Sequence, residues 1–143
     1  MTALLKRLLG DNAGSAIIEF AILAPAVVTL FLGILQVGTW MQSYNALRSI
    51  AADTSRYTAV QYQKANNISN ISMANWARNR ATAAYLFKEG DISTDVSDAA
   101  NQQIVGVTEK TLTITATYKS IMSIIGIDDQ AVTFSRPIFV KAN

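Results

Sequence analysis

Glu19 is the residue of this chain whose type and position most clearly suggest chemistry. It stands at the edge of an apolar run, and no Lys, Arg, Asp or Glu occurs from Phe20 to Leu47. A carboxylate in a low-dielectric environment takes up a proton unless a cation lies close to it. An ionisable group beside an apolar span therefore needs a partner or a function. We expect Glu19 either to pair with an amine or to reach the lipid headgroups by snorkelling.

Composition limits the other chemistry that the chain can perform. The 143 residues include neither Cys nor His, which removes thiol nucleophiles, disulfides, Ser-His dyads and most transition-metal sites. A net charge of +2 with scattered basic residues does not favour nucleic-acid binding. A hydrolase built on a carboxylate pair is disfavoured because the candidate acids fall in turn-like contexts: Asp95, Asp98, Asp128 and Asp129. We therefore expect no enzymatic activity, no catalytic residues, no metal, no cofactor and no nucleic-acid partner.

The element that positions Glu19 is predicted to be a membrane-spanning helix. The run from Phe20 to about Met41 is apolar, and about twenty helical residues cross a hydrocarbon core, so residues 15–41 are predicted to form the transmembrane helix. Pro25 lies inside this stretch and lacks a backbone amide, so we expect a helix kink or a local loosening there. Trp40 and Tyr44 suit the far membrane interface. A signal peptide cut within the run is disfavoured, because the product would keep a second apolar stretch and the region before the cut would contain Glu19.

The head of this helix resembles a known processing signal. Glu19 is the fifth residue after Gly14 and is followed by Phe20 and an apolar helix, which is similar to the recognition pattern of prepilin peptidase in type IV pilins and pseudopilins. More narrowly, the run from Gly14 through Pro25 to Gly38 resembles the TadE-like family of the tight-adherence (Tad, Flp-type) pilus system. Members of this family are small pseudopilins with a single membrane span.

The resemblance implies a cleavage site between Gly14 and Ser15, with Ser15 as the mature N-terminus. It also implies that Glu19 meets the new α-amino group of Ser15, in its own chain or in an adjacent subunit. The helix from Phe20 onward would then pack against other pilin-like helices. The implied partners are prepilin peptidase, other pilin or pseudopilin subunits, the inner-membrane Tad assembly platform and membrane lipid.

The same resemblance suggests a division of the chain and a location for it. Residues 1–14 would be a cytoplasmic leader, residues 15–41 a transmembrane helix and residues 42–65 a helix extension. Residues 66–143 would form a periplasmic or extracellular α+β domain. The protein would be a single-pass protein of the bacterial inner membrane with a cytoplasmic N-terminus, whether or not it later enters the pilus.

The soluble part is predicted to add one helix and three short strands. The spacing predicts a second helix over residues 73–88 with Ser72 as its N-cap and Gly90 as a stop signal. The side predicted to be buried comprises Trp76, Arg80, Ala83, Ala84 and Phe87. Residues 91–98 are expected to form a solvated, capped turn before a short helix or strand.

The strands are predicted to form a small antiparallel sheet on the distal half of the long helix. Residues 103–107 and 111–118 are expected to pair as a hairpin, and residues 131–136 to form a third strand that Pro137 limits to an edge or bulge. The apolar segment 120–127 is too short to span a membrane. It is expected to pack under the sheet, touch the membrane surface or form an exposed docking patch. The predicted fold class is thus α+β, membrane-anchored and pilin-like.

Two functions remain for this architecture. The first is a pseudopilin or minor pilin of a Tad/Flp type IVb pilus, processed by prepilin peptidase and acting in pilus assembly and adhesion. The alternative is an uncleaved inner-membrane anchor that carries a periplasmic binding or scaffold module. The first predicts a mature chain that begins at Ser15, and the second an intact Met1.

Overall fold

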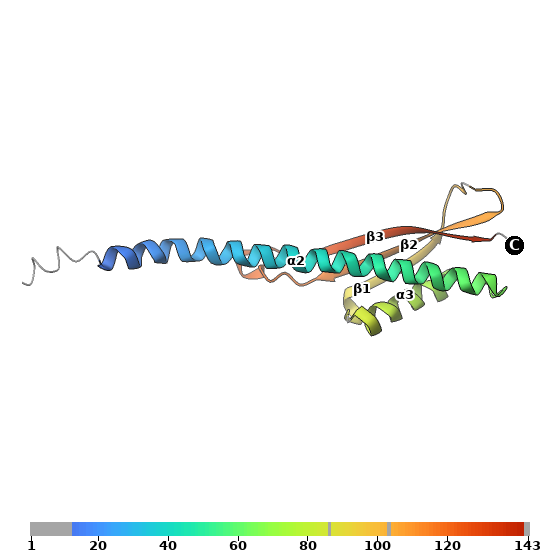
Figure 1. Ribbon diagram of the computed structural model, residues 1–143, viewed down its shortest axis with the longest axis horizontal. Helices are drawn as coiled ribbons and strands as arrows, with labels where there is room; N and C mark the ends of the chain where they lie inside the picture. The colour runs from blue at the N-terminus through green and yellow to red at the C-terminus, as the bar shows by residue number, and fades with distance from the viewer. Residues whose placement is uncertain (1–12, 86, 103, 142–143) are drawn as a thin grey trace, which may run out of the picture.

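The computed structural model describes residues 13–85, 87–102 and 104–141. The elements in chain order are α2 (Ala13–Gln63), α3 (Asn70–Tyr85), η1 (Glu89–Asp91), β1 (Ile92–Asp98), β2 (Val107–Tyr118), η2 (Ser123–Ile125) and β3 (Gln130–Lys141). Figure 1 shows α2 as a long rod, with α3 and the sheet packed along its C-terminal part. The predicted α+β class is confirmed. Residues 1–12 of the predicted leader lie outside the described residues.

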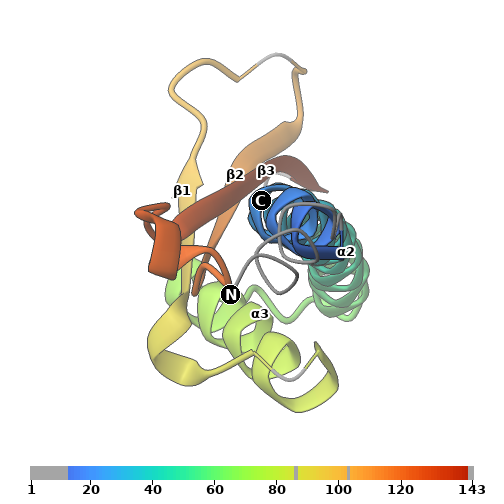
Figure 2. The same ribbon diagram turned by 90° about the vertical axis from the view of Figure 1, so that its left-hand side faces the viewer.

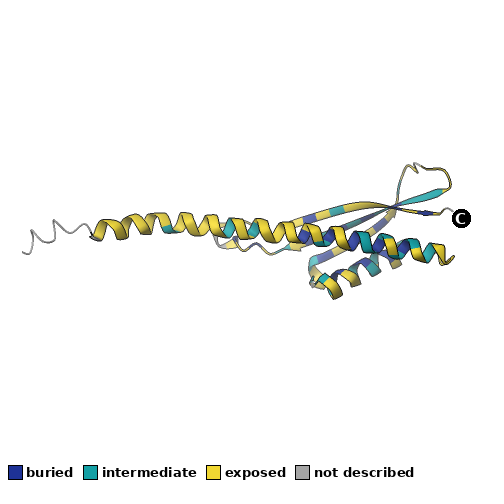
Figure 3. Cartoon of the chain, viewed as in Figure 1, coloured by how far each residue is buried: buried dark blue, intermediate teal, exposed yellow. Residues whose placement is uncertain are grey.

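Helix α2 has two halves with different surroundings. Its 51 residues extend about 76 Å at 1.5 Å per residue. By length and composition it is the one helix in the described part of the chain that is long and apolar enough to cross a membrane. Its N-terminal half projects beyond the rest of the protein and is exposed (Figure 3). The large exposed apolar side chains of that half are Ile17, Ile18, Phe20, Ile22, Leu23, Val27, Val28, Leu30, Phe31, Ile34, Leu35 and Val37.

Helix α3 begins earlier in the chain than the sequence predicted. Its first helical residue is Asn70, so Ser69 and not Ser72 is the N-cap. The Ser69 hydroxyl oxygen accepts a hydrogen bond from the Ser72 backbone amide at 3.2 Å. This is the usual geometry of a capping serine, whose side chain satisfies one of the free amides of the first turn.

The buried side of α3 also differs from the prediction. Small residues and a flexible methionine line it, at a spacing of four residues: Met73, Ala77 and Ala81. Trp76 is only half-buried and stacks on Tyr57 of α2, with ring centroids 4.6 Å apart. Arg80 is exposed and donates from Nε to Asp53 Oδ2 of α2 at 3.0 Å. The buried side of α3 therefore joins the common core, and the stacked Trp76 and the Arg80 ion pair link α3 to α2.

The sheet has three antiparallel strands in the order β1-β2-β3. Alternation along β2 directs Leu112 and Ile114 into the core, whereas Thr113 and Thr115 lie on the opposite face. Viewed along the long helix in Figure 2, α2 and α3 lie on one side of the sheet. Helix α3 packs on β1, and α2 packs on β3 and β2. A small sheet of this kind needs such a helical cover to bury its apolar face.

The core is formed by the distal half of α2, α3 and the inner face of the sheet. Its buried members are Leu47, Ile50, Ala51, Met73, Ala77, Ala81, Ile92, Val96, Leu112, Ile114, Ala116, Val132, Ile138 and Val140. The members from α2 begin at Leu47, the last residue of the uncharged run. One continuous helix therefore supplies both an uncovered apolar rod and one wall of a folded domain.

Two strand predictions were wrong. The predicted turn at residues 91–98 contains β1, which pairs with β2 from Ile92 opposite Ala116 to Asp98 opposite Lys110. Of the predicted strand at residues 103–107, the described residues 104–106 form a bend and a turn, and Val107 begins β2. The Val107 amide donates back to the Ile104 carbonyl at 3.3 Å.

The third strand is longer than predicted, because β3 continues through Pro137 to Lys141. Proline is tolerated there because β3 is an edge strand, where a missing amide does not break an inner ladder.

Candidate functional site

The predicted processing residues lie in the first turns of α2. Gly14, Ser15, Glu19 and Phe20 are all helical and exposed. The Ser15 hydroxyl donates to Glu19 Oε1 at 3.1 Å, because residues four apart share one face of a helix. The structure thus brings Ser15 and Glu19 together and leaves Phe20 on an open apolar surface.

Gly14 has space around it. A Cβ atom built at this position meets nothing within 4 Å. A larger side chain at residue 14 would therefore not disturb the fold of the described chain. An effect of such a substitution on processing would report recognition by a protease.

Pro25 lies inside α2, which continues through it without a break. The Thr29 hydroxyl donates to the Pro25 carbonyl at 2.7 Å, one turn further along the helix. The kink at Pro25 remains a prediction.

The far end of the apolar half contacts the folded domain. Trp40 and Tyr44 are 45% and 42% exposed, and the Tyr44 ring meets Phe134 of β3 edge-on at 5.7 Å. One turn before Trp40, Gln36 Oε1 accepts a hydrogen bond from the Ile121 amide at 3.0 Å. This contact could not be predicted from the sequence, because residues 36 and 121 are distant in the chain.

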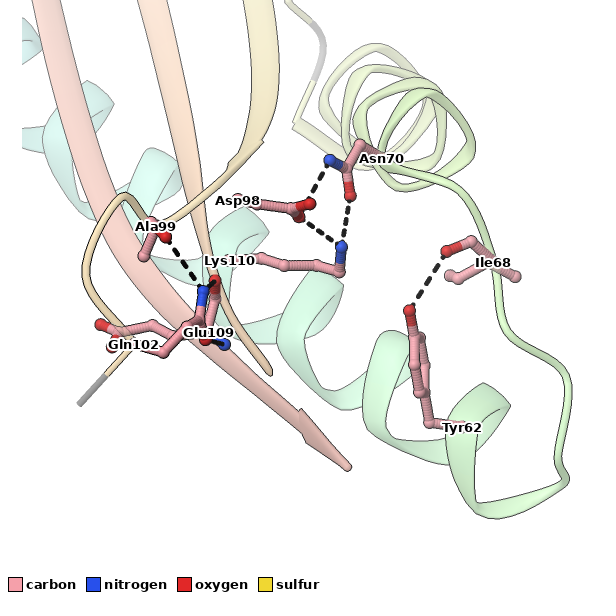
Figure 4. Close-up of polar contacts among 8 residues, drawn as sticks. All are labelled: Tyr62, Ile68, Asn70, Asp98, Ala99, Gln102, Glu109 and Lys110. Carbon is pink, nitrogen blue, oxygen red and sulfur yellow. Dashed lines mark hydrogen bonds and ion pairs between the residues drawn. The ribbon is translucent and has the colours of Figure 1, made fainter. Parts of the chain in front are cut away.

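A polar cluster at the distal end of the domain joins α3 to the sheet (Figure 4). The Lys110 ammonium group donates to Asn70 Oδ1 at 2.8 Å and to Asp98 Oδ1 at 2.5 Å. Asn70 Nδ2 also donates to Asp98 Oδ1 at 3.2 Å. The hydrogen bonds from Lys110 and then Asn70 lower the pKa of Asp98, and the charge of Lys110 adds to the effect. This cluster satisfies the buried end of Lys110, so its evident role is structural.

An open cleft of about 700 Å³ lies beside α2, α3 and the end of β2. Its lining includes Ser43, Tyr85 and Tyr118, and Lys119 is its one charged lining residue. Burial raises the pKa of Tyr118, and a hydrogen bond with Ser43 opposes this rise. The lining contains no acid that would act with Lys119 as an acid-base pair. Among the residues described, no three of Asp and Glu gather closely enough to hold a metal ion.

These features define a class of protein in which the C-terminal half of a long helix packs in an α+β unit. The N-terminal half of that helix is apolar and exposed, with the acid Glu19 near its start. A protein-family model described as TadE-like protein matches residues 14–56. Over this segment the chain is TadE-like, which supports a TadE-like protein of the Tad pilus system and confirms the resemblance. The match covers most of α2 and ends before α3 and the sheet. Comparisons with curated proteins and with solved structures gave no match.

The match over residues 14–56 indicates a broad function. A TadE-like protein is associated with the Tad pilus, as a structural or assembly component. The apolar half of α2 together with the pilus family indicates membrane anchoring. The same match suggests interaction with other pilus components.

Proposed function

We propose that this chain is a pseudopilin or minor pilin of a Tad/Flp pilus that is cut by prepilin peptidase between Gly14 and Ser15. The observation that carries the proposal is the position of Glu19, one helical turn from Ser15 and in contact with it at the head of the apolar helix. The family match begins at Gly14, the residue that would precede the cut. Residues 1–14 would then be a cytoplasmic leader and residues 42–143 would lie outside the inner membrane.

Cleavage would change the electrostatics of the helix head. The Ser15 amide would become an ammonium group within one turn of the Glu19 carboxylate. A cation at this distance favours the ionised carboxylate even where the dielectric is low. The amine of an adjacent subunit would serve equally well, and either pairing aligns the helix head in an assembly.

The rest of the apolar half supplies the packing surface. Gly38 is exposed, and a Cβ atom built there meets nothing within 4 Å among the described residues, so a neighbouring helix has room to approach. Small residues permit close packing of membrane helices, where dispersion replaces the hydrophobic effect. In this proposal the α+β unit remains outside the membrane and contributes lateral or tip contacts.

Processing is tested at Gly14. The Gly14→Arg variant should keep its leader, whereas Gly14→Ala, which retains a small residue, should be processed. A Cβ atom at residue 14 meets nothing within 4 Å among the described residues, so we expect neither variant to disturb the folded domain. A Gly14→Arg product that still loses residues 1–14 would contradict the proposed site.

The pairing role is tested at Glu19 by counting pili on cells. Glu19→Ala and Glu19→Gln should both abolish or strongly reduce piliation, because neither side chain carries a charge. Ser15→Ala is the matched control: it removes the hydroxyl that contacts Glu19 but keeps the backbone amine, so piliation should persist. Normal piliation in Glu19→Gln would rule out charge pairing.

A further inference from the structure

The loop between β2 and β3, residues 119–129, contains apolar side chains that the folded domain leaves uncovered. We propose that this β2–β3 loop contacts the membrane, with Ile121, Ile125 and Ile127 lying among phospholipid acyl chains beside the spanning helix. The inference requires α2 to cross a bilayer. It does not depend on cleavage after Gly14.

The loop is attached to the apolar half of α2. The Ile121 amide donates to Gln36 Oε1 at 3.0 Å. Figure 1 shows the loop running alongside α2, beyond the end of the sheet and toward the helix N-terminus. Leu32, Gly33 and Gln36 are partly covered in this part of the helix, whereas most of their neighbours are exposed (Figure 3).

The position of Gln36 along the helix places the loop at a membrane boundary. Gln36 follows Glu19 by 17 residues, which is about 25 Å at 1.5 Å per residue, and follows Ser15 by 21 residues, about 31 Å. A hydrocarbon core is about 30 Å thick. If the helix head lies at one boundary, Gln36 therefore lies near the other. Trp40, one turn further, then falls in the interface that tryptophan prefers.

The composition of the loop suits this position. Residues 120–127 carry no charge, and Lys119 and Asp128 stand immediately outside them. Ile121 is 44%, Ile125 51% and Ile127 39% exposed. Transfer of each isoleucine side chain from water to the acyl chains would lower the free energy.

Most backbone amides of the loop are hydrogen-bonded within the chain. This suits an apolar environment, where an unpaired amide is costly. Six of the eight amides in residues 120–127 have an acceptor within the chain: Ser120, Ile121, Met122, Ile125, Gly126 and Ile127. The Ser120 amide is satisfied by Asp129 Oδ1 at 2.8 Å, across the base of the loop. The loop therefore requires little help from water to satisfy its amides.

Packing within the domain does not account for the loop. Met122 and Ser120 are buried, so the loop uses these two side chains to attach itself to the domain. Ile121, Ile125 and Ile127 remain substantially exposed and are not part of this attachment. Of the alternatives for an uncovered apolar loop, lipid is favoured over a second subunit because the loop continues the apolar surface of the spanning helix.

The test uses single-cysteine variants of the full-length chain, which has no native cysteine. An environment-sensitive fluorophore is attached to Ile125→Cys, and the protein is reconstituted at one copy per phosphatidylethanolamine/phosphatidylglycerol nanodisc. Leu30→Cys, within the span, is the positive control. Val105→Cys is the matched negative control, because Val105 is a fully exposed apolar residue in the loop at the opposite end of the sheet. Quenching is measured with nitroxide-labelled lipids and with aqueous iodide.

We expect the probe at residue 125 to be quenched severalfold more by nitroxide lipid than the probe at residue 105, with blue-shifted emission and weak iodide quenching. Equal lipid quenching at residues 125 and 105, with strong iodide quenching at both, would overturn the proposal. Shielding of residue 125 that requires two copies per disc would also overturn it and would assign the loop to a subunit interface.

Discussion

The Asp98→Asn substitution tests whether the Asn70–Asp98–Lys110 cluster stabilises the folded domain through its charge. The Lys110 side chain is only 10% exposed, whereas that of Asp98 is 59% exposed. Hydrogen bonds to charged groups contribute about 1.5–3 kcal/mol when shielded, and exposed ion pairs about 0.2–1 kcal/mol. Because water screens the carboxylate, we expect a loss of about 1 kcal/mol at neutral pH. For a folded unit of about 100 residues this lowers Tm by about 4–8 °C.

The effect should depend on pH in a defined direction. The pKa of Asp98 is lowered from its ordinary value of 3.8, so the unfolded chain binds this proton before the folded one. The stabilisation is therefore fully present above the unfolded pKa and is lost as the pH falls through the lower folded pKa. The difference in free energy of unfolding between wild type and Asp98→Asn should shrink to nearly zero at strongly acidic pH.

The assay is thermal unfolding of the full chain in detergent, followed by tryptophan fluorescence. A Trp40→Phe background leaves Trp76, which stacks on Tyr57 between α2 and α3, as the one tryptophan. Asp95→Asn is the matched control: it removes an equal charge from the same strand, at an exposed position. Equal shifts of Tm in the two variants, or a difference that persists at strongly acidic pH, would refute the reasoning.

Three further substitutions test separate features of the fold by the same unfolding assay. Leu47→Ala should cost about 2–5 kcal/mol because Leu47 is fully buried in the core, while Leu30→Ala in the uncovered half of α2 should leave the domain transition unchanged. Gly126→Ala should cost about 1 kcal/mol because Gly126 has a φ of 84°, whereas Gly33→Ala, at an unstrained helical position with open space, should not destabilise the domain. Ser69→Ala should cost about 1 kcal/mol through loss of the α3 N-cap, and an unchanged Tm would contradict the capping role.

The long helix and the central strand were predictable because their local signals are strong. An uncharged apolar run with no effective breaker predicts one helix, and α2 ends at Gln63, close to the predicted end at residue 65. Strict alternation of Thr with Leu, Ile and Ala predicts a strand with one buried face, and β2 has that face. In both cases local preference and tertiary packing agree.

Strand β1 was missed because its sequence, ISTDVSD, is rich in residues that favour turns. Only Ile92 and Val96 are buried there, and pairing with β2 and cover by α3 outweigh the local preference. Conversely, the apolar residues Ile104 and Val105 suggested a strand, but Gly106 has a φ of 82° and the chain turns there.

The candidate site was likewise predictable only where its residues lie close together in the sequence. The spacing from Gly14 to Glu19 is local, and the sequence revealed it together with the helix that holds both residues. The contact of Gln36 with Ile121 and the cluster around Lys110 depend on strands that return to distant helices. A single sequence contains no local signal for such contacts.

The central claim is that the chain is a processed pilin-like subunit, and the mass of the N-terminal peptide tests it most directly. The protein is isolated from cells that carry an active Tad system, and its N-terminus is identified by mass spectrometry. We predict a chain that lacks residues 1–14 and begins at Ser15. A chain that retains Met1 and the whole leader in those cells would contradict the account and favour an uncleaved membrane anchor.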